Sequence, residues 1–300
     1  MQRREFIGVT AAALAGAMAA KADGEAVLLQ RVIPSSGEKI PVIGLGTSGP
    51  FEVGVDPQQR VPLGAVLTAF FAGGGTFIDT SPMYSTAEAV LGDLLTPAMQ
   101  ERAFVATKVW TRGEQEGVRQ MTRSRELLRR RKIDLMQVHN LLDLEVQLRT
   151  LRRWKAEGRI RYIGITHYTV ASHDTLADII RREPLDFVQF NYSATTPAAE
   201  NTLLPLCADR GVATIINRAF DDGKIFAQLR GTALPSWAGD IGCSSWAQVL
   251  LKYVISHPAV TCVIPATGKV ANMQDNLAAG RGPLPDAPLR RVIAAAVQQV

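Results

Sequence analysis

Four polar side chains of the kinds that move protons occur in the first half of the sequence: Asp79, Tyr84, Lys108 and His139. Such a set suits the reduction of a carbonyl group, because negative charge develops on the carbonyl oxygen when the carbon accepts hydride. That oxygen must then receive a proton, which a tyrosine hydroxyl can supply. An isolated tyrosine has a pKa near ~10 and is a poor acid at neutral pH, unless a neighbouring positive charge stabilises the phenolate.

The other three side chains have complementary roles in that chemistry. Lys108 would provide the positive charge beside the Tyr84 hydroxyl, and Asp79 would hold the Lys108 ammonium in place. His139 would donate a hydrogen bond to the carbonyl oxygen and so orient the substrate. No side chain can donate a hydride, and this chemistry therefore requires a cofactor.

Asp79, Lys108, His139 and Thr166 each come directly after a short apolar run of the kind that is typical of buried strands. Tyr84 lies in the loop after Asp79. Taken singly, each of these residues has a simpler reading as a turn former or a surface residue. The apolar runs predict strands at 42–45, 76–78, 104–107, 135–138, 162–165, 187–190, 213–216 and 260–264.

Longer stretches with helical periodicity separate these runs. They predict helices at 64–72, 87–95, 117–130, 144–157, 174–182, 201–210 and 245–256. Two short apolar runs around Ser35, Ser36 and Gly37 predict a β-hairpin ahead of the repeat.

The repeated alternation of strand and helix predicts an α/β fold, a (β/α)8 TIM barrel with the β-hairpin at its N-terminal end. An open doubly wound sheet is the alternative, but GLGTSG after the first strand lacks the spacing of a G-x-G-x-x-G phosphate loop. In a barrel, the carboxyl ends of all strands share one face, so the four distant side chains would form one site.

The segments that carry these side chains resemble those of the aldo-keto reductase family, over nearly the whole range 40–280. DTSPMYSTAEAVLG is similar to the family's Asp-Thr-x-x-x-Tyr-Gly-x-Ser-Glu-x-x-Leu-Gly segment, with departures at Ser85 and Ala87. ATKVW, DLMQVHN and GRIRYIGIT resemble the lysine, histidine and fifth-strand segments. The resemblance implies a catalytic tetrad with members Asp79, Tyr84, Lys108 and His139.

The resemblance also implies that NADPH, or alternatively NADH, binds above the barrel. Thr166, His167 and Gln189 would hold the nicotinamide carboxamide, with Thr166 in place of a usual serine and His167 in place of a usual asparagine. Asn217 stands where family members often have an aromatic residue that stacks on the nicotinamide, and Arg218 would reach the pyrophosphate. The alternatives are a turn-capping Thr166, a Gln189 that faces the barrel interior and a surface Arg218.

In the eighth-strand segment, the resemblance implies that Asp275 and Asn276 contact the adenine. The Lys and Arg that bind the 2′-phosphate in many members are replaced here by Ala and Asn, which leaves Thr267 and Lys269 as phosphate partners. A preference for NADPH rests on the family pattern more than on these residues.

Two aromatic residues are expected to form walls of the substrate pocket. Phe51 follows the first strand, and Trp110 lies two positions after Lys108. Packing in the core is the alternative for both. The loops that shape such a pocket do not identify the substrate, beyond its being a small carbonyl compound.

The composition of the 300-residue chain is that of a globular protein, with 47% hydrophobic and 20% charged residues. The formal net charge is +5, and the densest basic run, at 123–132, has leucines at helical spacing. We expect a solvated helix face there and no nucleic-acid partner. Cys207, Cys243 and Cys262 form no C-x-x-C pair, so no metal site and no disulfide framework is indicated, although one bridge is left open.

The N-terminus contains Arg3, Arg4 and Phe6, followed by an apolar, alanine-rich run at 9–20 that is too short to span a bilayer. This pattern resembles a twin-arginine (Tat) signal peptide, which we place at 1–24, with the barrel at 25–300. A Sec signal and an uncleaved anchor are the alternatives. The Tat interpretation predicts a partner during export, the Tat translocase, a periplasmic location and no stable membrane span after cleavage.

Three functions are compatible with these observations. The tetrad favours an NAD(P)H-dependent reductase of aldehydes or ketones. A cofactor-binding barrel with a redox-sensing or regulatory role is the alternative, and the changed cofactor positions keep it open. An exported carbohydrate- or metabolite-binding barrel is a third, which would bind no nicotinamide cofactor.

Overall fold

The structure is a computed structural model that describes residues 27–299. The segment that we interpret as a signal peptide, 1–24, lies outside the described residues. Within them, no helix is long and apolar enough to cross a membrane.

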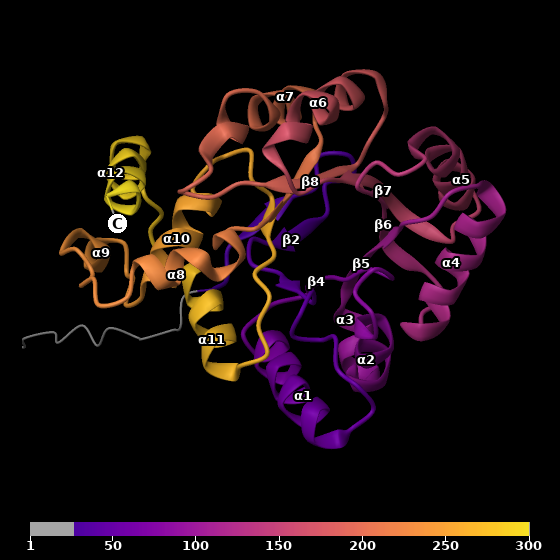
Figure 1. Ribbon diagram of the computed structural model, residues 1–300, viewed down its shortest axis with the longest axis horizontal. Helices are drawn as coiled ribbons and strands as arrows, with labels where there is room; N and C mark the ends of the chain where they lie inside the picture. Colours follow the sequence, from indigo (N-terminus) through magenta and orange to yellow (C-terminus); the bar gives the residue numbers. More distant parts are fainter. Residues whose placement is uncertain (1–26, 300) are drawn as a thin grey trace, which may run out of the picture.

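Eight parallel strands form one sheet in the order β10-β9-β8-β7-β6-β5-β4-β3, with helices around it (Figure 1). Bridges of Ile43 to Val263 and of Gly46 to Ala266 bring the two edge strands together and close the barrel. The (β/α)8 fold expected from the sequence is therefore confirmed. The strands are β3 (Leu45–Gly46), β4 (Phe77–Asp79), β5 (Phe104–Val109), β6 (Ile133–His139), β7 (Ile160–Thr166), β8 (Phe187–Asn191), β9 (Ala213–Asn217) and β10 (Cys262–Val263).

The expected β-hairpin is also present, as β1 (Gln30–Val32) paired antiparallel with β2 (Lys39–Pro41). Its residues Ile33 and Ile40 belong to the hydrophobic cluster of the barrel interior, together with Phe77, Phe104 and Phe187. The rings of Phe77 and Phe104 stack with their centroids 5.0 Å apart. Because large side chains fill this part of the barrel, space for a ligand remains only toward the carboxyl ends of the strands.

Every helix that the periodicity predicts is present, with ends shifted by a few residues. These helices are α1 (Pro57–Ala72), α2 (Ala87–Leu94), α4 (Glu114–Leu127), α5 (Leu144–Ala156), α6 (His173–Arg182), α7 (Leu203–Arg210) and α10 (Trp246–Ile255). The largest shift is at α1, which begins at Pro57 because Asp56 caps it by accepting a hydrogen bond from the Gln58 N–H.

The structure adds helices that the sequence did not suggest: α3 (Pro97–Arg102), α8 (Lys224–Gln228), α9 (Trp237–Asp240), α11 (Val270–Ala279) and α12 (Ala287–Gln298). The first three are too short to show a periodicity. α11 packs against α1 and α10 on the outside of the barrel. Single turns of 3-10 helix also occur, as η1 (Val170–Ser172), η2 (Pro197–Glu200) and η3 (Asp221–Gly223).

Two glycines allow the barrel to close. A Cβ atom at Gly44 would lie 2.8 Å from the carbonyl oxygen of Phe77, and one at Gly46 would lie 2.7 Å from that of Ile264. The backbone of this segment therefore approaches both neighbouring strands more closely than any side chain would permit.

Candidate active site

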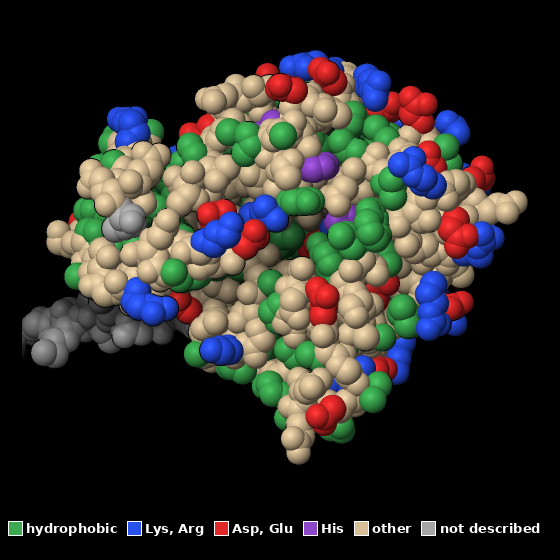
Figure 2. Space-filling model, viewed as in Figure 1, with side chains coloured by type: hydrophobic (Ala, Val, Ile, Leu, Met, Phe, Trp, Pro, Cys, Tyr) green, Lys and Arg blue, Asp and Glu red, His purple; other side chains and the backbone are tan. Residues whose placement is uncertain are grey.

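A cavity of about 620 Å³ opens at the carboxyl ends of the strands. The same face of the molecule carries histidine and hydrophobic side chains near its centre, beside a small group of acidic and basic ones (Figure 2). Side chains from seven of the eight strand ends or the loops after them line the cavity. They include Thr47, Asp79, Tyr84, His139, Thr166, Gln189, Asn217, Arg218 and Ala266.

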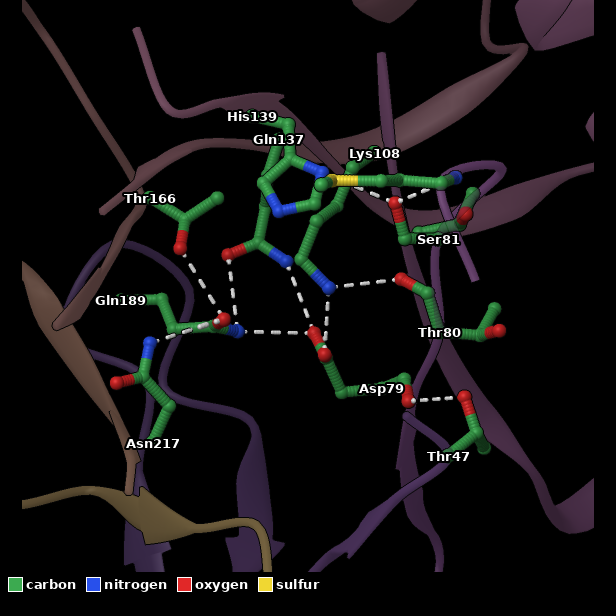
Figure 3. A network of polar contacts seen from close by, with 12 residues as sticks. Thr47, Asp79, Thr80, Ser81, Lys108, Gln137, His139, Thr166, Gln189 and Asn217 are labelled. Carbon is green, nitrogen blue, oxygen red and sulfur yellow. Dashed lines mark hydrogen bonds and ion pairs between the residues drawn. The ribbon is translucent and has the colours of Figure 1, made fainter. Parts of the chain in front are cut away.

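Asp79 and Lys108 form a buried ion pair at the base of this site (Figure 3). The Lys108 Nζ lies 2.5 Å from the Asp79 Oδ2 and also donates to the carbonyl oxygen of Thr80 at 2.8 Å. Burial opposes the charge on Lys108, but the adjacent Asp79 carboxylate outweighs it, and the pKa of Lys108 is raised. The ammonium therefore stays charged, although it has no access to water.

The second carboxylate oxygen of Asp79 accepts two amide hydrogen bonds. The Nε2 of Gln189 donates to Oδ1 at 2.9 Å and the Nε2 of Gln137 donates to it at 3.1 Å. The sequence analysis missed Gln137, which lies inside the apolar run of β6. One signal was available, because Gln137 lies two positions before His139 and strand residues at that spacing face the same side.

Tyr84 lies above this ion pair, in the loop between β4 and α2. The Lys108 Nζ lies 4.9 Å from the centroid of the Tyr84 ring. Burial raises the pKa of Tyr84, and the opposing effect of the Lys108 charge does not overcome it. The Lys108 charge therefore lowers the pKa of this phenol by less than burial raises it, because desolvation of the phenolate is the larger effect. The hydroxyl keeps its proton.

His139 ends β6 and lies next to Tyr84, with the two rings edge to face and their centroids 6.0 Å apart. Its Nδ1 lies 3.0 Å from the hydroxyl of Ser81. Burial lowers the pKa of His139 to about 3, and the charge of Lys108 acts in the same direction. The imidazole is therefore neutral at physiological pH.

Three of the residues expected to hold a nicotinamide form one hydrogen-bonded group at the cavity wall. Thr166 donates to the Oε1 of Gln189 at 3.1 Å, and the Nδ2 of Asn217 lies 3.4 Å from the same atom. The Asn217 Oδ1 is buried and has no hydrogen-bond partner within residues 27–299. This group therefore presents an acceptor that a ligand amide would satisfy.

His167 is not in that group. Its Nδ1 accepts from the backbone N–H of Tyr168 at 3.0 Å, and its ring stacks on the Tyr168 ring at 5.3 Å between centroids. The imidazole is thus bound to its own loop and does not line the cavity. Its backbone does contact the group: the His167 N–H donates to the Gln189 carbonyl oxygen at 3.0 Å, and the His167 carbonyl oxygen accepts from the Asn217 Nδ2 at 3.2 Å.

Arg218 lines the cavity with a left-handed backbone, φ 54°. Its guanidinium lies 4.4 Å from the Tyr168 ring centroid, and its Nε lies 3.3 Å from the Asp222 carboxylate. The side chain therefore spans the loops after β7 and β9 at the mouth of the cavity.

The residues expected to contact the adenosine part of a cofactor lie beside the cavity, at the start of α11 and along it. Thr267 Oγ1 accepts from the backbone N–H of Lys269 at 3.1 Å, and Lys269 directly precedes the helix. Asn276 is buried. Asp275 accepts from Ser245 Oγ at 2.7 Å and from Gln248 Nε2 at 2.6 Å, so its carboxylate joins α11 to α10.

The two expected pocket walls differ in their placement. Phe51 is completely buried in the core between the barrel and its helices, and it does not line the cavity. Its predicted role as a pocket wall is thus not supported, and the packing alternative applies. Trp110 is 39% exposed, with its ring centroid 6.4 Å from that of His139. It lies near the site without lining the cavity.

This arrangement can transfer a proton and stabilise charge. A protonated phenol, a buried ammonium and a neutral imidazole gather around one cavity, whose far wall carries amide groups. Residues 27–299 contain no cluster of three His, Cys, Asp or Glu side chains that could hold a metal ion. In the same range the three cysteines are free and buried.

Comparison with known proteins identifies the family and the fold. The model of the "Aldo/keto reductase family" matches residues 42–296. Methylglyoxal reductase YeaE of Escherichia coli (strain K12) is 29% identical over 257 residues, which cover 83% of this chain and 89% of that protein. Probable aldo-keto reductase 1 of Glycine max is 25% identical over 309 residues, and the match covers 87% of this chain and 87% of that protein. An aldo-keto reductase from Klebsiella pneumoniae in complex with NADPH superimposes with a TM-score of 0.76 at 23% identity, covering 90% of this chain and 95% of that one.

Proposed function

The chain belongs to the aldo/keto reductase family, and from that membership we propose that it reduces an aldehyde or ketone to an alcohol with hydride from a nicotinamide cofactor. The single observation that carries the proposal is the position of Tyr84. Its ring lines the cavity, with the Nζ of the buried Lys108 at 4.9 Å from the ring centroid.

The residues at the cavity fit a nicotinamide nucleotide. Asn217, whose buried Oδ1 has no partner among the described residues, would hold the carboxamide together with Gln189 and Thr166. Arg218 would hold the pyrophosphate. Lys269 and Thr267, at the start of α11, would hold the adenosine end. The bound cofactor supplies the hydride. We propose NADPH, which the Klebsiella pneumoniae protein binds, with NADH as the alternative.

The chain's own residues perform the proton transfer. His139 donates a hydrogen bond to the carbonyl oxygen and places it near the Tyr84 hydroxyl. Tyr84 then gives its proton to that oxygen as negative charge develops there. Lys108 stabilises the phenolate that remains, and Asp79, held by Gln137 and Gln189, keeps the ammonium in position.

The substrate that we propose is a small carbonyl compound, and methylglyoxal is the first compound to test because a relative is a methylglyoxal reductase. The mouth of the cavity is partly apolar, with Met83, Tyr168 and Phe226 among the exposed large hydrophobic residues. An aromatic aldehyde such as benzaldehyde belongs in the same panel for that reason.

A regulatory barrel with little turnover is less consistent with these observations. A binding or sensing role needs the cofactor wall but gives no reason to bury the Asp79–Lys108 pair beneath a protonated phenol, which costs folding energy. We therefore retain the enzyme as the proposal.

The test is a turnover assay on the purified protein, which follows NADPH or NADH absorbance with a panel of aldehydes and ketones. Reduction of at least one carbonyl substrate, with kcat lowered in Tyr84→Phe, is expected. Cofactor binding by fluorescence without turnover of any substrate would favour the regulatory barrel, and the absence of cofactor binding would exclude both.

We also propose that the protein is exported to the periplasm by the twin-arginine route, on the sequence of residues 1–24 alone. That route carries folded proteins, so a cofactor bound in the cytoplasm would be exported with the barrel. Fractionation of cells that express the full chain, with Arg3→Lys/Arg4→Lys as the comparison, tests the route. Nucleotide released on denaturing the periplasmic protein tests the loading. Export that persists unchanged in the double variant would contradict the Tat assignment.

A further inference from the structure

The buried hydroxyl of Ser81 connects the Tyr84 loop to His139. Ser81 lies two positions after Asp79, and its side chain is completely buried. Its Oγ lies 3.0 Å from the Nδ1 of His139 (Figure 3). Ser81 is not among the residues to which the sequence analysis gave a role.

A count of donors and acceptors fixes the direction of this hydrogen bond. The backbone N–H of Met83 donates to the Ser81 Oγ at 3.2 Å, which occupies one of its lone pairs. The hydroxyl proton needs an acceptor, because a buried donor without a partner is costly. Within residues 27–299 the His139 Nδ1 is the acceptor in reach. Ser81 therefore donates to Nδ1, and the single proton of the neutral imidazole is on Nε2.

The opposite direction is less favourable. If Nδ1 carried the proton and donated to Ser81, the Ser81 hydroxyl proton would be buried without an acceptor. The doubly protonated ring is excluded at neutral pH, since burial and the charges of Lys108 and His167 lower the pKa of His139 to about 3. The Nε2 atom has no hydrogen-bond partner among the described residues, and the His139 side chain lines the cavity.

We propose that Ser81 is a positioning residue that fixes His139 as its Nε2–H tautomer, so that the imidazole presents a hydrogen-bond donor to the substrate carbonyl oxygen. The inference rests on the proposed function for the identity of the acceptor. A fixed tautomer matters because the other one would present a lone pair to the carbonyl oxygen and repel it. The same serine also shapes the loop through Met83, so it aligns the donor His139 with the acid Tyr84.

Nitrogen NMR of histidine-labelled full-length protein tests this without any substrate. The sequence contains four histidines, and His139→Gln identifies the signal of His139 by its loss. At pH 7 the wild type is expected to show a protonated Nε2 and an unprotonated Nδ1. In Ser81→Ala the two tautomers should coexist, while Ser81→Thr, which keeps the hydroxyl, should restore the wild-type pattern.

Kinetics provide the second readout. Removal of an oriented donor costs ~10²–10³ in rate, so Ser81→Ala, which only loosens the donor, should lose about ten-fold in kcat/KM. Ser256→Ala is the control: Ser256 is a half-buried serine at the end of α10 that donates to the Tyr253 carbonyl oxygen and does not line the cavity, so this variant should leave kcat/KM and the His139 signal unchanged.

A protonated Nδ1 in the wild type would overturn the proposal, and so would a Ser81→Ala protein with the wild-type tautomer and kcat/KM. Failure of the proposed function is distinguishable, because it would appear as a wild type that reduces no carbonyl compound while its His139 signal shows the expected tautomer. If Ser81→Ala changed only the stability and not the tautomer, the serine would be a turn former alone.

Discussion

The hydroxyl of Thr107 donates a buried hydrogen bond of 2.5 Å to the carboxylate of Glu88. Thr107 precedes Lys108 on β5, and since neighbouring strand residues face opposite sides, Thr107 faces the outer helices while Lys108 faces the barrel interior. Glu88 lies in α2, which follows the loop of Tyr84. Its other oxygen accepts from Ser124 of α4 at 3.0 Å. Glu88 thus joins the strand of the ammonium to the helix that anchors the phenol.

We predict that Glu88→Ala destabilises the fold by about 2–4 kcal/mol, because it leaves a cavity and two buried hydroxyl groups without their acceptor. Urea denaturation followed by circular dichroism measures this change. Glu116→Ala, which removes an exposed carboxylate on α4, should change stability by no more than ~0.5 kcal/mol. Equal effects of the two substitutions would show that Glu88 does not have the structural role described here.

Tyr84→Phe should lower kcat for carbonyl reduction by ~10²–10⁴-fold, because it removes the proton donor and little volume. The dissociation constant of the cofactor, measured by fluorescence titration, should stay within two-fold of the wild type (about 0.4 kcal/mol). Undiminished turnover on a good aldehyde substrate would remove Tyr84 from the mechanism.

Lys108→Met should abolish reduction and also destabilise the protein by about 3–5 kcal/mol, because it leaves the Asp79 carboxylate buried without its cation. The double variant Asp79→Asn/Lys108→Met removes the uncompensated charge, so we expect it to regain most of the stability but none of the activity. Thermal unfolding and turnover of the three proteins separate the two effects. A double variant as unstable as Lys108→Met would contradict the assignment of that loss to the unpaired carboxylate.

The pH profile of kcat/KM for reduction should be flat between pH 5 and 8. The pKa of His139 is lowered to about 3, so its ring stays neutral as the pH falls through 6.5, where an ordinary histidine would gain a proton. The pKa of Tyr84 is raised by burial, so the phenol keeps its proton as the pH rises toward 10. Activity is therefore expected to fall only on the alkaline side. A step near pH 6.5 that is absent in His139→Gln would contradict this account of the site.

The barrel and the placement of three tetrad members were predictable because each side chain directly follows an apolar strand, and the barrel brings strand ends together. The role of Gln137 could not be predicted, because a glutamine inside an apolar run indicates a site residue only once its hydrogen bond to Asp79 is known. The location of Phe51 could not be predicted either, since one aromatic residue after a strand suits a pocket and a core equally well. Whether the pKa of Tyr84 is raised or lowered depends on the relative effects of burial and of the neighbouring Lys108 charge. Both depend on the three-dimensional packing, which the sequence alone does not show.

The edge where β3 meets β10 is held by isolated bridges, whereas β6 and β7 pair along six positions. Local opening costs least where the fewest backbone hydrogen bonds must break. The amide protons of Gly44, Gly46 and Val263 should therefore exchange with solvent sooner than those of β6 and β7. Thr47 and Ala266 line the cavity on either side of this edge. A ligand that contacts both residues would therefore stabilise the closed edge and slow the exchange of these amide protons.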